Sequence, residues 1–415
     1  MKKALSILLA MGMTVGMVAG CGDTADNSSA ADNSAAASTE AGTQAAASAA
    51  DIKVGVIYIG DENEGYTAAH MAGIDEMAAN LGLSDDQIVE KTTIPEDESC
   101  YDAAVDLADQ GCNIIFATSF GHETYILQAA QEYPDIQFCH ATGYQAASSG
   151  LSNMHNYFDA IYEARYVSGV VAGMKLNEMI ENGDITADQA KIGYVGAFPY
   201  AEVISGFTSF YLGAKSVCES VTMEVQYTNS WADMTAEGEV ANQLIADNCV
   251  LISQHADTTG APSACETAGV PCVGYNVDMT SVAPDAALTS PTNNWGVYYT
   301  YAVQCVLDGK AIDTDWCKGF SEDAVRITPV NEAVAAEGTD AKVEEVEAAL
   351  KDGSLHVFDT STFTVSGSSL EDLIAEGGDY AKYADYVSDG YYHESELASA
   401  PSFDIIIDGI TSQAN

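Results

Sequence analysis

Basic residues are scarce in this 415-residue sequence, which has 14 Lys and Arg against 62 Asp and Glu and a formal net charge of −48. A nucleic-acid-binding protein needs a basic surface against the phosphate backbone, so this charge excludes that class of function. It also argues against a direct electrostatic attachment to anionic lipid head groups. The charge does not indicate disorder, because charged residues make up only 18% of the chain and hydrophobic residues 47%. That composition is sufficient for a large buried core.

Several motifs of enzymes and cofactor-binding proteins are also absent from the sequence. It has no C-x-x-C pair, no G-x-G-x-x-G after a predicted strand, no P-loop and no G-x-S-x-G. His122 and Glu123 begin a zincin-like pattern, but position 126 is Ile instead of the second His. His255 and Asp257 could supply two metal ligands, but no second His pair is near them in sequence. We therefore predict no cofactor, no metal site and no catalytic residue, and we expect a protein that is not an enzyme.

The N-terminus has the organisation of an export signal. Lys2 and Lys3 precede an apolar stretch at 4–18, and the small residues Ala19 and Gly20 precede Cys21. This ending resembles a bacterial lipobox, in which the signal is removed and the Cys is acylated; an ordinary signal peptide with an incidental Cys is the alternative. We predict a lipoprotein signal peptide at 1–20, and an acylated Cys21 with a disordered Ala- and Ser-rich tether over 21–50.

The rest of the chain has no other apolar run of the roughly 18 residues that a membrane-spanning helix needs. The prediction is a protein on the extracytoplasmic face of the cell membrane, held there by its lipid alone. Nine further Cys, an odd number, follow Cys21, and several lie in apolar runs, which favours buried free thiols over disulfides.

Beyond residue 50 the hydrophobic pattern alternates between strands and helices. Residues 52–60 (IKVGVIYIG) form an apolar, β-branched run typical of a buried parallel strand, and residues 66–81 have helical spacing. Further strands are predicted at 87–94, 113–118, 136–141, 191–197, 221–228, 250–254, 271–275 and 287–290. Further helices are predicted at 100–110, 123–133, 159–180, 202–220, 234–246, 261–268 and 295–308. This alternation predicts an α/β fold with parallel sheets, divided into two similar halves by the helix at 159–180.

We expect two Rossmann-like lobes with a ligand cleft between them. Lobe 1 is predicted to comprise 51–157 plus about 284–318, and lobe 2 to comprise 158–283 plus about 319–415. In such folds ligands bind at the loops that follow the strands. Aromatic and acidic residues collect in those loops, which suggests a flat ligand that stacks on rings and donates hydrogen bonds to carboxylates. The candidate ligand-binding residues are Asp61, Glu62, Tyr66, Phe120, Phe198, Asn229, Trp231, Asp257, Gly274, Asp278, Asn293 and Trp295. Basic residues are scarce near these loops, which disfavours a phosphorylated ligand.

A set of short segments, in order from about 52 to 300, gives the chain a specific resemblance to a known family. They are 53–58 (KVGVIY), 65–67 (GYT), 138–143 (FCHATG), 165–169 (RYVSG), 192–199 (IGYVGAFP), 202–204 (EVI), 229–231 (NSW), 254–257 (QHAD), 274–276 (GYN), 288–290 (LTS) and 295–296 (WG). The chain resembles the basic membrane protein family of ABC-transporter substrate-binding lipoproteins, whose members include purine nucleoside receptors. The resemblance is weaker beyond residue 320.

The resemblance implies a type I periplasmic-binding-protein fold whose two lobes close around the ligand. It also implies that one aromatic from each lobe sandwiches the base; Tyr66 and Phe198 stand at those positions. Asp278 stands where nucleoside-binding members use an acid against ribose hydroxyls. Those members have a Lys shortly after the Thr-Ser pair, whereas 291–293 reads PTN here. Because that Lys is missing, a free purine base such as adenine fits at least as well as a nucleoside.

The implied partners are an ABC permease with its ATPase and a small purine or nucleoside, and the protein is expected to be a monomer. Three alternatives remain open at this stage. A receptor of the same fold for a sugar or signalling molecule would use similar aromatic and acidic residues. An exported nucleoside-cleaving enzyme would use the cleft acids for catalysis, and a surface interaction protein would bind no small molecule.

Overall fold

The structure is a computed structural model and describes residues 50–413. The predicted signal peptide, Cys21 and the predicted tether up to residue 49 lie outside the described residues. Within the described range, no helix is long and apolar enough to cross a membrane. None of the nine cysteines in this range is in a disulfide; eight are buried and Cys317 is half-buried.

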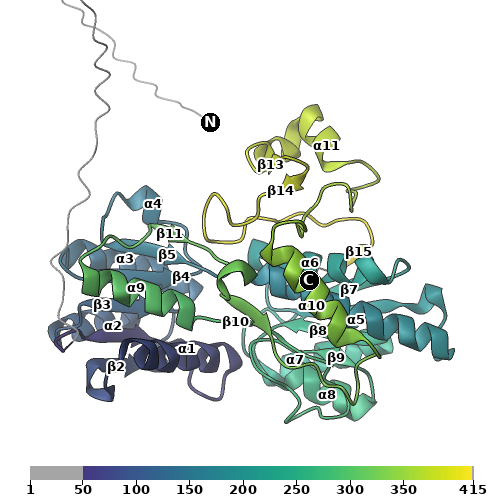
Figure 1. Ribbon diagram of the computed structural model, residues 1–415, viewed down its shortest axis with the longest axis horizontal. Helices are drawn as coiled ribbons and strands as arrows, with labels where there is room; N and C mark the ends of the chain where they lie inside the picture. Colours follow the sequence, from purple (N-terminus) through teal and green to yellow (C-terminus); the bar gives the residue numbers. More distant parts are fainter. Residues whose placement is uncertain (1–49, 414–415) are drawn as a thin grey trace, which may run out of the picture. The chain divides into compact units, whose positions relative to one another are not determined.

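The first parallel sheet has six strands within the described residues, in the order β11-β5-β4-β3-β1-β2. Their bounds are β1 (Val54–Ile57), β2 (Ile88–Lys91), β3 (Ile114–Ala117), β4 (Gln137–Ala141), β5 (Met154–Tyr157) and β11 (Asp315–Trp316). The helices that alternate with them are α1 (Gly65–Leu81), α2 (Glu98–Asp109), α3 (Glu123–Glu132) and the short α4 (Ala146–Ser149). Every residue of β1 and β3 is buried, as expected for strands covered on both faces. The later helix α9 (Gly296–Asp308) packs against α1, and Figure 1 shows it beside these earlier elements.

The second parallel sheet has five strands in the described part of the chain, in the order β15-β7-β6-β8-β9. They are β6 (Lys191–Gly196), β7 (Thr222–Tyr227), β8 (Leu251–His255), β9 (Cys272–Val273) and β15 (Ile410–Gln413). The helices of this part are α5 (Ile161–Asn182), α6 (Ala201–Val217), α7 (Met234–Ala246), α8 (Gly260–Ala268), α10 (Thr339–Lys351) and α11 (Leu370–Glu376). Two small antiparallel pairs complete it, β10 (Pro291–Asn293) with β12 (Val325–Ile327) and β13 (Val387–Ser388) with β14 (Tyr391–Tyr392).

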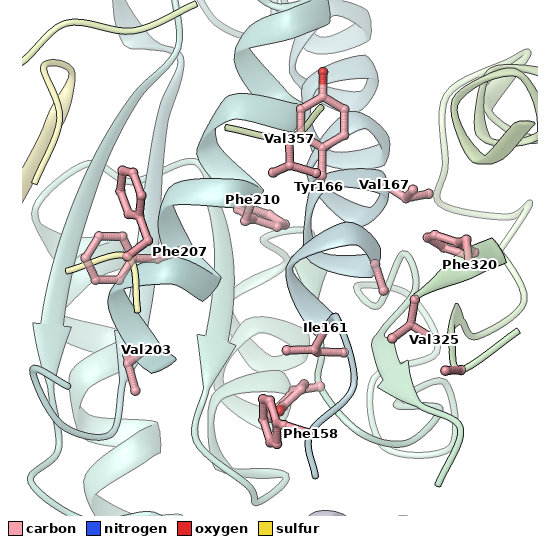
Figure 2. Close-up of a cluster of buried hydrophobic side chains, with 14 of the residues drawn as sticks. Phe158, Ile161, Tyr166, Val167, Val203, Phe207, Phe210, Phe320, Val325 and Val357 are labelled. Carbon is pink, nitrogen blue, oxygen red and sulfur yellow. The ribbon is translucent and has the colours of Figure 1, made fainter. Parts of the chain in front are cut away.

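The helices α5 and α6 pack against each other within the largest hydrophobic cluster of the described residues. Gly169 and Gly213 allow their close contact, because a Cβ on either glycine would lie 2.0 Å from a backbone oxygen of the other helix. Phe207 and Phe210 of α6 are fully buried, and Figure 2 shows them in the same cluster as Ile161 of α5. The packing of α5 against α6 therefore depends on small residues at the contact and large ones around it.

The chain passes between the two sheets three times within the described range: after β5, between β9 and α9, and after β11. Two of these crossings lie side by side. The amide of Phe158 donates to the Trp316 carbonyl at 3.0 Å, and the amide of Ala160 donates to the Lys318 carbonyl at 2.8 Å. Asp159 lies between these two donors; its side chain is 1% exposed.

The predicted parallel α/β fold is confirmed, and the predicted helices correspond to α1–α3 and α5–α9. The strand predicted at 287–290 is wrong. Ala287 forms only a single bridge to Cys272, and the next strand, β10, begins at Pro291 and is antiparallel to β12. Residues 286–289 still form backbone hydrogen bonds with 272–274, but the Ser290 carbonyl accepts from the Thr328 amide at 2.8 Å, so the pairing changes partner before a regular strand forms.

Candidate functional site

A cavity of about 370 Å³ lies where the carboxyl ends of the strands of both sheets meet. Its lining comes from the segments that follow β1, β2, β3 and β4 of the first sheet and β6, β7, β8 and β9 of the second. This volume falls within the range of small-molecule sites, which is roughly 300–1,000 Å³. Ligands of open parallel sheets bind in this position because the loops after the strands converge there.

Tyr66 supplies an aromatic wall from the first-sheet side. The side chain of Glu64 caps α1 by accepting hydrogen bonds from the amides of Tyr66 (2.7 Å) and Thr67 (2.9 Å), which fixes the start of the helix. The Tyr66 hydroxyl donates to the Thr118 carbonyl at 2.6 Å. The Tyr66 ring meets His70 edge to face, with centroids 4.4 Å apart. The ring is therefore held at both ends while it lines the cavity.

Phe198 and Trp231 supply the aromatic wall from the second-sheet side. Their ring centroids are 5.4 Å apart at 62°, an edge-to-face arrangement. Phe198 is also stacked on Tyr200, with centroids 5.1 Å apart and 12° between the planes. Asn229 and Ser230, just before Trp231, line the cavity as well, and Asn229 has a left-handed φ of 57°, which Asn tolerates.

The rim of the cavity is formed by aromatic side chains that remain partly in solvent. Phe120, which follows β3, is 42% exposed, and Tyr200, which precedes α6, is 47% exposed. Their centroids are 6.1 Å apart at 29°. The contact joins the segment after β3 to the segment before α6; of the two side chains, Phe120 lines the cavity and Tyr200 lies outside the lining.

The floor of the cavity is acidic. Glu64, Glu202 and Asp257 line it, whereas no Lys or Arg lines it among the described residues. Burial raises the pKa of Glu202 to about 7, although Arg165 opposes the shift. Burial, with repulsion from Glu64, also raises the pKa of Asp257 well above its usual range. A cavity with these groups favours a ligand rich in N–H or O–H donors and disfavours a phosphate.

The second-sheet loop that bears Asp257 is tied directly to α1. The amide of Gly65, the first residue of α1, donates to the Asp257 carbonyl at 3.1 Å. A Cβ on Gly65 would lie 3.1 Å from the same oxygen, which is a tight contact, so glycine leaves room for this close approach. The Asp257 side chain accepts a hydrogen bond from Asn276 at 2.8 Å, which fixes one of its two oxygens.

A buried cation lies behind the acidic floor. The Arg165 guanidinium is 3.7 Å from the centre of the Tyr275 ring, and its Nη1 donates to the Gln254 carbonyl at 2.6 Å. His255 lies beside Glu202, with Nε2 3.5 Å from Oε1. Burial, together with Arg165, holds the pKa of His255 well below its usual range, so this imidazole is neutral at pH 7.

The structure brings six of the predicted site residues together around the cavity: Tyr66, Phe120, Phe198, Asn229, Trp231 and Asp257. The other six lie outside the lining. Three of these are acids in loops. Asp61 accepts hydrogen bonds from its neighbour Asn63, and Glu62 is exposed. Asp278 is exposed and accepts from the Thr280 amide at 2.8 Å. The two Asp side chains satisfy local turn donors, which is the usual behaviour of Asp in such loops.

The remaining three lie in the packed interior. Trp295 is fully buried and stacks on His70 with centroids 4.2 Å apart, so it supports Tyr66 from behind. Asn293 is 2% exposed in β10. Gly274 is required by packing, since a Cβ there would lie 2.5 Å from the side chains of Met279 and Ser290.

Sequence reasoning missed several residues of the cavity, namely Glu64, Glu96, Ser119, Glu202, His255 and Tyr275. Of these, Glu202, His255 and Tyr275 lie inside the segments that indicate the family, which was the available signal. No group of three or more metal-ligating side chains occurs within residues 50–413.

Comparison with known proteins agrees with this architecture. Two solved structures share the fold: a solute-binding protein of an ABC transporter from Conexibacter woesei and one from Aeropyrum pernix. The first has a TM-score of 0.59 at 19% identity and covers 74% of this chain and 98% of its own. The second has a TM-score of 0.61 at 17% identity and covers 78% and 96%. Both support the type I periplasmic-binding-protein fold expected from the sequence.

Three relatives found by sequence have a higher identity to this chain than these two solved structures have. A purine-binding protein of Brucella abortus is 34% identical over 318 residues, which is 76% of this chain and 85% of that protein. A Haloferax volcanii protein, named as a candidate glucose-binding protein of an ABC transporter, is 36% identical over 48% of this chain and 46% of its own. Basic membrane protein A of Borreliella burgdorferi is 26% identical over 46% and 54%. The model of the Bmp family, described as ABC transporter substrate-binding protein PnrA-like, matches residues 51–355 of this chain. The chain therefore belongs to the Bmp family of ABC-transporter substrate-binding proteins.

Proposed function

We propose that this protein captures a purine base or purine nucleoside and delivers it to an ABC permease, without chemical change to the ligand. The observation that supports this most is the composition of the cavity. Tyr66, Phe198 and Trp231 offer ring faces and edges, Glu202 and Asp257 offer hydrogen-bond acceptors, and the described lining has no Lys or Arg. Aromatic side chains stabilise a stacked base by about 1–3 kcal/mol each.

The purine-binding relative in Brucella abortus supports the same ligand class, since it is 34% identical over an alignment that covers 76% of this chain. We further propose that the protein acts outside the cytoplasmic membrane as a monomer, anchored by an acylated Cys21. The two-lobe division expected from the sequence, 51–157 plus about 284–318 and 158–283 plus about 319–415, is proposed as the pair of bodies that close on the ligand.

The test is a binding panel on the purified exported protein, by calorimetry, with adenine, guanine, hypoxanthine, adenosine, inosine, ribose and glucose. We expect heat of binding with at least one purine and none with ribose. Binding of glucose without any purine would contradict the proposal and favour the sugar-receptor alternative, which the Haloferax volcanii relative makes a relevant control. Recovery of intact adenosine after incubation is expected; its cleavage would show an enzyme. Cys21→Ser is expected to release the protein from the membrane fraction.

A further inference from the structure

Glu202 is a carboxyl group without a hydrogen-bond donor in the described part of the chain. It is the second residue of α6, and its side chain is 15% exposed toward the cavity that it lines. Nε2 of His255 lies 3.5 Å from Oε1 of Glu202, which is longer than a good hydrogen bond. A carboxyl placed this way obtains its partners from whatever occupies the cavity.

The groups around Glu202 do not neutralise it by ion pairing. His255, at the end of β8, is neutral because burial and Arg165 lower its pKa. Arg165, from α5, is the buried cation of this region, but its guanidinium lies on the Tyr275 ring and its Nη1 donates to the Gln254 carbonyl. Its field lowers the pKa of Glu202, yet burial dominates.

The other ionisable groups that face Glu202 are Tyr66 of α1, Tyr275 after β9 and Asp257 after β8. Burial raises the pKa of both tyrosines well above 10, so they are neutral at pH 7. Asp257 is a second acid, with Oδ1 occupied by Asn276 and no hydrogen bond from the described residues to Oδ2. The field of Glu202 also contributes to the raised pKa of Asp257. The cavity floor thus has two carboxyl groups with free oxygens and no cation between them.

We propose that Glu202 is the residue that selects among purines, by contacting the polar edge of the stacked ring in a way that depends on its proton. This inference rests on the proposed function and adds the selectivity of the site. A protonated carboxyl donates one hydrogen bond and accepts one. That pattern matches the adjacent N6 amino group and ring nitrogen of adenine. An ionised carboxyl only accepts, and it matches the two adjacent donors, N1–H and the 2-amino group, of guanine.

The size of the effect follows from proton linkage. Burial raises the pKa of Glu202 to about 7. If adenine binds the protonated form, its affinity is complete below that pKa and is lost as the pH rises through it. Between pH 6 and pH 8 the dissociation constant for adenine should rise about tenfold, whereas that for guanine should fall about tenfold. Neither purine gains or loses a proton in this interval, so the change belongs to the protein.

The experiment measures adenine binding to the exported protein by calorimetry at pH 6, 7 and 8, and guanine binding by competition with labelled adenine. Glu202→Gln has the donor and acceptor pattern of the protonated acid at every pH and nearly the same volume. We expect this variant to lose the tenfold rise in the adenine dissociation constant between pH 6 and pH 8, and to lose guanine binding. Glu219→Gln, an exposed acid beyond the end of α6, is the matched control and should behave as the wild type.

Glu202→Ala is a second variant, and it should bind adenine more weakly and also without the tenfold rise in the dissociation constant. Melting temperatures of all variants establish that they fold. The inference is overturned if the wild type binds purines but Glu202→Gln keeps the same pH dependence and the same adenine-to-guanine ratio. If the wild type binds no purine at any pH, the proposed function itself fails, and the selectivity role fails with it.

Discussion

The ring and the hydroxyl of Tyr66 have separable roles, and two substitutions distinguish them. Tyr66→Ala removes the ring that lines the cavity, so ligand affinity should fall by the stacking contribution of about 1–3 kcal/mol, or about 5- to 150-fold in Kd. Tyr66→Phe keeps the ring and removes the 2.6 Å hydrogen bond to the Thr118 carbonyl. It should reduce the free energy of unfolding by about 1–3 kcal/mol, because that carbonyl loses its donor. Its Kd should change by less than about threefold.

The assays are calorimetry with the best purine of the panel and urea unfolding followed by tryptophan fluorescence. Unfolding is measured without ligand, so that weaker binding is not mistaken for lower stability. An unchanged Kd for Tyr66→Ala would show that the ring does not stack on the ligand. If Tyr66→Phe weakens binding as much as Tyr66→Ala does, the hydroxyl is the recognition group and the ring is not.

Three further predictions concern the rim, the crossing segments and the C-terminal part. Phe120→Ala removes the 6.1 Å ring contact with Tyr200. Because such a contact contributes about 0.5–1.5 kcal/mol, the ligand dissociation rate measured by stopped-flow should rise about 2- to 12-fold. An unchanged rate would exclude a role of Phe120 in retaining the ligand. Burial raises the pKa of Asp159, so folding favours its protonated form and stability falls as the pH rises above about 4. Asp159→Asn should therefore raise the melting temperature more at pH 7 than at pH 4, and an equal shift at both would contradict this. Glu394 accepts hydrogen bonds from the amides of Ser402 (3.0 Å) and Phe403 (2.9 Å). Glu394→Ala leaves both amides without this acceptor, so the free energy of unfolding measured in urea should fall by about 2–4 kcal/mol. A loss under about 0.5 kcal/mol would show that water replaces the side chain.

The elements with a strong local pattern were predictable from the sequence. The apolar run at 52–60 became β1, and the long helix predicted at 159–180 became α5. Elements that depend on distant partners were not predictable. The segment β15 has little local signal and is a strand because it pairs with β7, far earlier in the chain. Short strands such as β11, with two residues, have the same origin.

The candidate site was predictable as a region, because loops after parallel strands converge. The direction of each side chain was not predictable, because it depends on the turn that follows the strand. Asp278 and Asp61 follow the right strands but satisfy donors within their own turns. Glu202 lies just after β6, at the second position of α6, and was not singled out, because the sequence does not show that its side chain turns toward His255 and the cavity.

The order of strands in the two sheets has a consequence for how the chain folds. β5 pairs with β11 and β7 pairs with β15, so each sheet receives an edge strand from a much later part of the sequence. Contacts with such large sequence separation form slowly, because a long loop must close before they contribute. Until then β5 and β7 have an open edge that can pair with another chain. We therefore expect the folding intermediates of this protein to be more prone to aggregation than the native state. The edges of β5 and β7 become protected only when β11 and β15 pair with them, in the last folding steps.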